Sequence, residues 1–208
     1  MTAKKIRTIT ILILIAVVGI IGLSGIYRVN QGEQAVVLTF GEKSDVKEAG
    51  MYWHLPMIQK VQIQSTTQVY TLEYGFETTA VATSKTQAVY KEKPEESIML
   101  TMDQNIVSVE AVYVVKVADV SLFLYQVDDQ WKTMQCVFET VMRRTLQNRT
   151  LDDALLNRQE IETEVLKDFK AMLLPYNMGI TVNAVKIQNI EVPAELKAAY
   201  EDVINAKN

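Results

Sequence analysis

The residues of this sequence that could carry out acid–base or nucleophilic chemistry are few and far apart. It contains one histidine, His54, and one cysteine, Cys136. A Ser-His-Asp triad needs its histidine beside a nucleophile, whereas His54 stands between Trp53 and Leu55, which favours a strand or membrane-proximal position. A single histidine excludes a multi-histidine metal site, and a single cysteine excludes an intramolecular disulfide and a cysteine-based zinc site. The sequence also has no Gly-x-Ser-x-Gly elbow and too few glycines for a phosphate-binding loop.

Clustered carboxylates are the remaining candidates for catalysis or metal binding. Two carboxylates act as acid and base only where a site separates their pKa values, and here they lie in amphipathic helical patterns, which indicates a solvated face. These residues are Asp152, Asp153, Glu160, Glu162 and Glu164. We expect three nearby arginines to form ion pairs with them rather than to bind phosphate: Arg143, Arg144 and Arg149. The sequence therefore predicts no catalytic residue, no metal site and no cofactor.

The amino-acid composition limits the class of protein to which this chain belongs. The 208 residues include 25 acidic and 21 basic side chains, for a net charge of −4. That balance argues against a nucleic-acid partner, because phosphate neutralisation needs a basic surface. With 49% hydrophobic and 22% charged residues, the chain also has the composition of a folded protein rather than a disordered one.

An apolar segment near the N-terminus predicts a membrane anchor. Residues 8–27 carry no charge, and a helix of about 20 residues spans the roughly 30 Å hydrocarbon core of a bilayer. The predicted anchor residues are Ile9, Leu12, Leu14, Val17, Ile20 and Leu23. A cleaved signal peptide is the alternative, but the apolar run is longer than a usual signal core and no Ala-x-Ala site follows it. We therefore expect an uncleaved transmembrane helix.

The charges that flank this segment predict its orientation. Lys4, Lys5 and Arg7 precede it, while only Arg28 follows closely. The positive-inside bias keeps residues 1–7 in the cytoplasm and sends the rest of the chain across the membrane. On an oxidising side of the membrane the lone cysteine fits only if it is buried, where a thiol is mostly inert.

Residues 28–192 carry the periodicities of an α+β domain. Strands are predicted at 34–40, 51–55, 61–64, 98–101 and 106–117, with extended character at 66–73. We interpret 41–50 as a polar hairpin loop and 74–96 as an excursion loop. Helices are predicted after Asp119, after Asp129 and after Thr150, and a further one ends at Pro175. A strand then follows Gly179, and residues 193–208 begin a last helix that is cut short.

Five runs, in this order, resemble the SPFH or band 7 family of stomatin, prohibitin, flotillin and HflK/C proteins. YRVNQGEQAVVLTFG at 27–41 is similar to its opening strand, and EAGMYWHLP at 48–56 to its Glu-Pro-Gly-Leu-x-Trp-x-x-Pro run. MLTMDQNIV at 99–107 resembles its Leu-Thr-x-Asp-x-Asn-Ile-Val signature. YNMGI at 176–180 and VPAELKAAYEDV at 192–203 resemble the end of the domain in the HflK branch. Ala49 departs from the family pattern by replacing its proline, which loosens one turn.

The resemblance implies a non-enzymatic membrane scaffold. HflK-type proteins assemble with a related HflC-like partner into large oligomers in the bacterial cell membrane, where they enclose the membrane AAA+ protease FtsH and control substrate access. They continue into a long coiled-coil helix, so we expect this chain to be a fragment or truncated product. Tyr52, Trp53 and Leu55, close after the anchor, are expected either at the lipid interface or in the core. Assembly contacts are expected from Pro193, Leu196 and Tyr200.

Two other functional classes remain open at this point. A stomatin- or flotillin-like organiser of membrane microdomains would have a hairpin anchor and a cytoplasmic domain, so topology separates it from the protease modulator. A membrane-associated peptidase is the third hypothesis, and replacement of Ser97 or Asp103 without loss of hydrolytic activity would exclude it.

Overall fold

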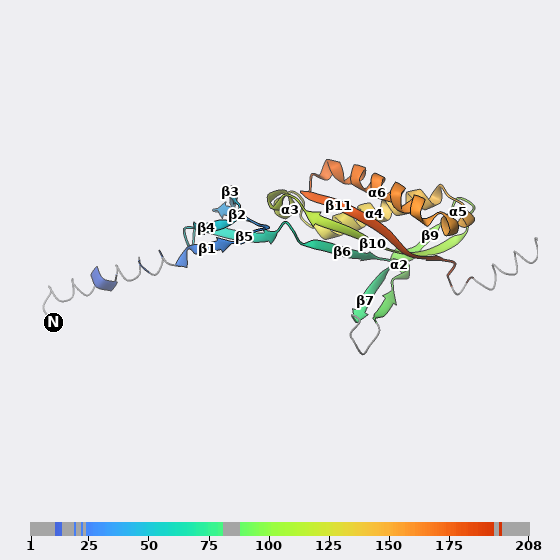
Figure 1. Ribbon diagram of the computed structural model, residues 1–208, viewed down its shortest axis with the longest axis horizontal. Helices are drawn as coiled ribbons and strands as arrows, with labels where there is room; N and C mark the ends of the chain where they lie inside the picture. Colours follow the sequence, from blue (N-terminus) through green and yellow to red (C-terminus); the bar gives the residue numbers. More distant parts are fainter. Residues whose placement is uncertain are drawn as a thin grey trace, which may run out of the picture. The chain divides into compact units, whose positions relative to one another are not determined.

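The chain folds as two compact units. The computed structural model describes residues 11–13, 19, 22, 24–80, 88–193 and 196. Unit 1 contains the residues up to Gln68 together with Asp119–Ser121, and unit 2 contains Val69–Ala118 and the residues from Leu122 onward. Antiparallel sheets and helices make up the described structure, so the α+β prediction is confirmed (Figure 1).

Unit 1 consists of two small antiparallel sheets. One pairs β1 with β4, and the other has the order β3-β2-β5. Their bounds are Ile26–Val29 for β1, Glu33–Thr39 for β2, Glu42–Lys47 for β3, Gly50–Trp53 for β4 and Gln59–Ser65 for β5. The core lies under β2, whose Ala35, Val36 and Val37 are buried. Apolar residues in β2, β4 and β5, and Pro56 after β4, account for the prediction of these three strands from the sequence.

The prediction of a hairpin loop at 41–50 is wrong, because most of that segment is strand β3. Its register with β2 runs from Ala35↔Lys47 to Thr39↔Glu42. The error has a physical cause: β3 is an edge strand with exposed polar residues, and backbone pairing with β2 rather than burial holds it in place.

Unit 2 is built on a four-stranded sheet of order β11-β10-β6, in which β9 also pairs with β10. The bounds are Val69–Tyr74 for β6, Ile98–Leu100 for β9, Ile106–Val117 for β10 and Ile180–Glu191 for β11. Along β10, every second residue from Val107 to Val117 is buried, as strict period-2 alternation predicts. β11 has two register shifts against β10, and side chains of α6 bind its backbone: Glu162 accepts from Ile187 N at 2.9 Å and Arg158 donates to Ile190 O at 3.3 Å.

Two long helices, α4 (Gln130–Gln147) and α6 (Arg158–Leu173), lie on the same side of this sheet (Figure 1). The other helical elements are α2 (Pro94–Ser97), α3 (Val120–Tyr125), α5 (Leu151–Leu156) and the 3₁₀ turn η1 (Leu174–Tyr176). The predicted helix starts are confirmed, since Asp129 accepts from Lys132 N and Thr150 accepts from Asp153 N.

An aromatic cluster joins the helices to the sheet. Phe138 of α4 stacks on Tyr113 of β10 at a centroid distance of 4.5 Å, and it meets Phe169 of α6 edge-on at 5.3 Å. Tyr74 of β6 completes the cluster at 5.1 Å from Phe138. All four rings are almost completely buried, so the cluster is part of the core of unit 2.

The segment 74–96 was expected to be a loop, and that expectation is also wrong. The described part of it forms the hairpin β7 (Phe76–Ala80) and β8 (Val89–Glu92), followed by α2, and the hairpin projects from unit 2 (Figure 1). Its polar and exposed residues give no periodic burial for a sequence pattern to detect. Gly75, with φ +81°, turns the chain from β6 into β7, and a Cβ there would lie 2.4 Å from Val109 O.

No helix within the described part of the chain is both long and apolar enough to cross a bilayer. Most of residues 8–27 lies outside the described residues. Of the predicted anchor residues, Leu12 is described and is exposed. The other five, Ile9, Leu14, Val17, Ile20 and Leu23, lie outside the described residues.

Candidate functional site

One face of the β1–β4 sheet exposes apolar side chains next to the predicted anchor. In this register Ile26 pairs with Trp53 and Arg28 pairs with Met51, and directly paired residues share a face of the sheet. Ile26, Met51 and Trp53 have exposed fractions of 53%, 73% and 52%. The pattern places apolar groups and one arginine together on the surface, a combination that suits the boundary between lipid and water.

Trp53 and His54 fix the segment that enters β1. The indole Nε1 of Trp53 donates to Gly22 O at 2.7 Å, and His54 N donates to Gly25 O at 2.9 Å. The imidazole Nδ1 of His54 lies 2.8 Å from the same carbonyl oxygen. Gly25 has no room for a side chain, because a Cβ there would lie 2.2 Å from His54 O. His54 therefore follows directly after β4, and both its backbone N and its ring contact the backbone of Gly25.

Two turns of unit 1 carry the most exposed large apolar side chains. Phe40 is 82% exposed and Met57 is 96% exposed. Both have positive φ, 54° and 75°, which is uncommon for residues other than glycine. Phe40 and Gly41 (φ 88°) are the central residues of the two-residue β2–β3 turn, and positive φ at both positions defines type I′.

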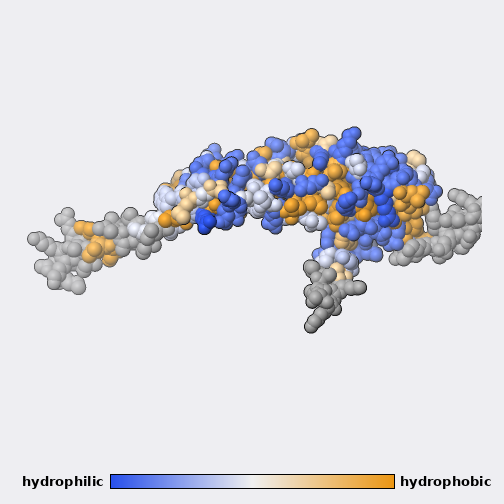
Figure 2. Space-filling view, viewed as in Figure 1, coloured by the Kyte–Doolittle hydropathy of each residue, from blue (hydrophilic) through white to orange (hydrophobic). Residues whose placement is uncertain are grey.

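These two turns lie side by side at one end of the β2–β5 pair. Thr39 pairs with Gln59, and Phe40 N donates to Ile58 O at 3.0 Å. Gln59 braces both turns, since its Nε2 donates to Thr39 Oγ1 at 3.2 Å and its Oε1 accepts from Leu55 N at 2.8 Å. The end that carries Phe40 and Met57 is thus the end at which β4 leaves its pairing with Ile26, where the apolar segment 8–27 ends. Hydrophobic residues reach the surface of this unit among hydrophilic ones (Figure 2).

The three residues expected at the interface or in the core take different environments. Tyr52 is half-buried, tilts against Tyr27 at a centroid distance of 5.8 Å and has Lys47 Nζ 5.5 Å from its ring. Trp53 is on the exposed face, and Leu55 is 38% exposed. We propose that exposed apolar side chains of unit 1 face lipid, and we call them the membrane-facing site: Ile26, Trp53, Leu55, Phe40 and Met57.

Phe40 and Met57 could not be selected from the sequence alone. Phe-Gly before a polar run signals a turn, and so does Pro-Met. Neither signal tells whether the apolar side chain folds inward or points to solvent. Their near-complete exposure, together with the positive φ, is what marks them.

The residues expected to make assembly contacts lie at the C-terminal end of the described chain. Pro193 and Leu196 are partly exposed, and Leu196 N donates to Pro193 O at 2.9 Å. Tyr200 lies outside the described residues.

Of the three arginines, Arg149 pairs with the carboxylates expected from the sequence, whereas Arg143 and Arg144 pair with other acidic residues. Arg149 reaches Asp153, Glu160 and Glu164 at 2.9, 3.2 and 2.7 Å. These hydrogen bonds, that to Glu164 above all, raise the pKa of the guanidinium. Arg144 pairs with Asp168, and Arg143 with Glu139. Within the described ranges, no three histidine, cysteine or acidic side chains gather as a metal site would require.

Cys136 contradicts one expectation. A buried thiol was expected for a domain on an oxidising side of the membrane, whereas Cys136 is exposed on α4. The helical stripe that predicts the core of α4 includes Met134, Phe138 and Val141, all buried, and Cys136 falls between two of its members on the opposite face.

Comparison with known proteins identifies the family. Residues 27–208 match the SPFH domain / Band 7 family. The chain belongs to this family. It is 28% identical over 193 residues to the modulator of FtsH protease HflK of Escherichia coli K12, covering 92% of this chain and 41% of that protein. It is 29% identical to protein HflK of Treponema pallidum over 91% of this chain and 57% of the relative. It is 26% identical to protein HflK of Borreliella burgdorferi over 96% of this chain and 64% of the relative. The chain thus spans about two fifths to two thirds of the length of these relatives.

The SPFH signature at 99–107 has a structural role in this chain. It forms the β9–β10 turn, where Asp103 accepts from Thr101 Oγ1 at 2.6 Å and from Leu151 N at 3.1 Å. Met102 N donates to Arg149 O at 2.9 Å. The signature therefore binds the sheet to the junction of α4 and α5. The hydrogen bond from Thr101 is the main cause that lowers the pKa of Asp103.

Proposed function

We propose that this SPFH protein is a non-enzymatic scaffold subunit of the HflK type. In this proposal residues 8–27 anchor it in the cell membrane, with the N-terminus in the cytoplasm and the SPFH domain on the other side. It assembles with an HflC-like partner into a large oligomer around an FtsH-type AAA+ protease and limits which substrates reach it. The observation that carries the proposal is similarity over about nine tenths of the chain to proteins named HflK, one of them named as a modulator of FtsH protease.

The membrane-facing site supports the position at the bilayer. Its apolar side chains lie at one end of unit 1, next to the segment that precedes β1. Tryptophan with its N–H bonded and its ring exposed is typical of membrane interfaces, and Trp53 has this arrangement through Gly22 O. Exposed Phe40 and Met57 add apolar area that water solvates poorly.

Topology can be tested with the cysteine chemistry of the chain itself. Leu156 is 81% exposed on α5, so a Cys136→Ser/Leu156→Cys chain carries one accessible thiol. The proposal expects a membrane-impermeant maleimide to label it in intact spheroplasts. Cys136→Ser alone is the matched control and should not be labelled. Labelling only after lysis would place the domain in the cytoplasm and favour the stomatin- or flotillin-like organiser.

Partners can be tested by a mild-detergent pull-down of the full-length gene product, followed by mass spectrometry. The proposal expects an AAA+ membrane protease and an HflC-like protein. Recovery of only self-assembled protein or lipid would contradict the modulator role and leave the general scaffold as the better explanation.

A further inference from the structure

The outer face of the β9–β10 pair exposes apolar side chains at one end of the unit 2 sheet. Leu100 pairs with Ile106, and Ile98 pairs with Ser108, so all of them share the face that alternates with the buried one. Ile98, Leu100 and Ile106 are 41%, 45% and 39% exposed, and Met102 in the turn after β9 is 59% exposed. We call these four apolar residues the outer patch.

The outer patch lies partly on an edge strand. Among the described strands, β9 pairs with β10 alone. An exposed apolar edge strand is a site of contact with another segment, because both its backbone and its side chains are accessible. A segment that covers the outer patch must bring an apolar face that reaches across β10 and β9.

The C-terminal segment leaves the sheet beside the outer patch. Glu191, the last residue of β11, pairs with Ser108, and Ser108 pairs on its other side with Ile98. These three residues form one row across the sheet. Because adjacent strands lie about 4.8 Å apart, the chain that continues into Pro193 leaves the sheet about 5 Å from β10 and about 10 Å from β9.

The sequence after β11 carries an apolar stripe of matching length. Residues 193–208 are predicted to begin a helix, and Leu196 N donates to Pro193 O at 2.9 Å. Leu196, Tyr200 and Val203 follow one another at spacings of four and three residues, which places them on one face of an α-helix. At about 1.5 Å per residue this stripe is about 10 Å long. That length equals the distance from β11 to β9 across the sheet.

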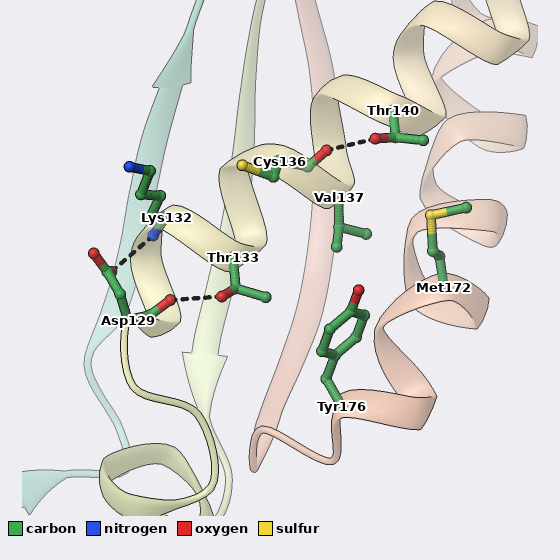
Figure 3. A pocket seen from close by; sticks show the side chains of 8 residues that line it. All are labelled: Asp129, Lys132, Thr133, Cys136, Val137, Thr140, Met172 and Tyr176. Carbon is green, nitrogen blue, oxygen red and sulfur yellow. Dashed lines mark hydrogen bonds between the residues drawn. The ribbon is translucent and has the colours of Figure 1, made fainter.

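A groove on the helical layer of unit 2 is also apolar, but the segment lies far from it within one chain. Val137, Met172 and Tyr176 line the groove, which has a volume of about 450 Å³ (Figure 3). It lies where η1 leads into β11, whereas the segment leaves at the far end of that 12-residue strand, about 40 Å away. The stripe begins three residues after Pro193, so it meets the outer patch and not the groove.

We propose that the C-terminal segment folds back as a helix across the outer patch of its own chain, with the stripe running from β10 to β9. The connection of a few residues gives the patch of the same chain a far higher effective concentration than the same patch on a second copy. Leu196 and Tyr200, expected from the sequence to make assembly contacts, cover the sheet of their own chain in this arrangement. The inference is independent of the protease-modulator role.

Cross-linking within one chain tests this arrangement. Leu100→Cys/Val203→Cys is made in the full chain together with Cys136→Ser, and native membranes are treated with a short bismaleimide. Mass spectrometry of tryptic peptides from the monomer band should find positions 100 and 203 joined. Leu100→Cys/Asn205→Cys is the matched control: its second thiol lies about 160° around the helix from Val203, and it should stay unjoined.

The reactivity of one thiol gives a second measurement that does not depend on the reach of a cross-linker. Leu100→Cys, again with Cys136→Ser, reports whether the outer patch is covered. Adding Tyr200→Asp should uncover it and raise the rate of reaction with a water-soluble maleimide about tenfold. Asn205→Asp adds the same charge on the opposite face of the helix and should leave the rate unchanged.

Three outcomes contradict the inference. Cross-linked peptides found only in dimers mean that the stripe meets a second copy. Equal joining of position 100 to positions 203 and 205 means that the segment has no preferred face toward the sheet. A maleimide rate that Tyr200→Asp leaves unchanged means that the outer patch is not covered. Each of these results overturns the intrachain contact.

Discussion

Replacing Phe40 by asparagine tests whether the membrane-facing site meets lipid, because two effects of opposite sign compete there. Phe40 occupies the first central position of a type I′ turn with φ 54°, and asparagine is preferred there. The substitution relieves backbone strain of about 1 kcal/mol. It also removes an apolar side chain whose complete burial is worth about 1.5–3 kcal/mol.

The exposed fraction of Phe40 decides how these effects add. In water the ring is 82% exposed, so its removal loses only about 0.4 kcal/mol of packing, and relief of strain leaves the variant about 0.6 kcal/mol more stable. If lipid covers the ring, the whole burial term is lost. The Phe40→Asn chain is then about 0.5–2 kcal/mol less stable.

The assay is urea unfolding of the full chain in phosphatidylcholine vesicles, followed by far-UV circular dichroism. We expect Phe40→Asn to lower the free energy of unfolding. Gly41→Ala is the matched control: a Cβ there meets no atom within 4 Å, but φ is +88°, so it adds strain of about 1 kcal/mol without changing apolar area. A Phe40→Asn chain more stable than the unsubstituted one would refute the lipid contact.

Three further substitutions test the fold of the two units. Gly25→Ala should disrupt the entry into β1, because its Cβ would lie 2.2 Å from His54 O; a red shift of Trp fluorescence measures this, and an unchanged spectrum would contradict it. Asp103→Ala should cost about 1–2 kcal/mol by removing the acceptor for Leu151 N. The folded pKa of Asp103 is below its ordinary value, so the stability that this carboxylate contributes is present above about pH 4 and is lost as the pH falls further. The free energy of unfolding, measured by urea titration at pH 7 and at pH 3, should therefore change less between the two pH values in the variant than in the unsubstituted chain. Phe138→Ala should cost about 3–5 kcal/mol, measured by the same titration, and a loss under 1 kcal/mol would exclude it from the core.

Elements whose residues divide cleanly between core and solvent were predictable from the sequence. β10 shows alternation over its whole length, and α4 and α5 begin at Asp129 and Thr150 as the capping pattern indicates. β3 and the β7–β8 hairpin were missed for the opposite reason, since both are mostly polar and exposed and are held by backbone pairing. Hydrophobic periodicity alone does not detect such strands.

The candidate site could be predicted only in part from the sequence, for a related reason. Trp53 and Leu55 follow the apolar segment closely in sequence, and that proximity suggested an interface. Phe40 comes near them only because Thr39 pairs with Gln59, a long-range register that sequence reasoning did not supply. The exposure of Cys136 depended on which side of α4 faces the sheet, one position away from buried Val137.

The two bulges of β11 and its backbone contacts with α6 have a consequence for how copies of this domain can associate. A regular 12-residue strand at the edge of a sheet is a template to which another chain can add a strand by main-chain hydrogen bonding. Such strand addition is the first step toward fibrils. In β11 the register is broken twice, and Glu162 and Arg158 occupy backbone groups that an incoming strand would need. This edge is thereby closed to strand addition, which protects copies of the domain at high local concentration from irreversible aggregation.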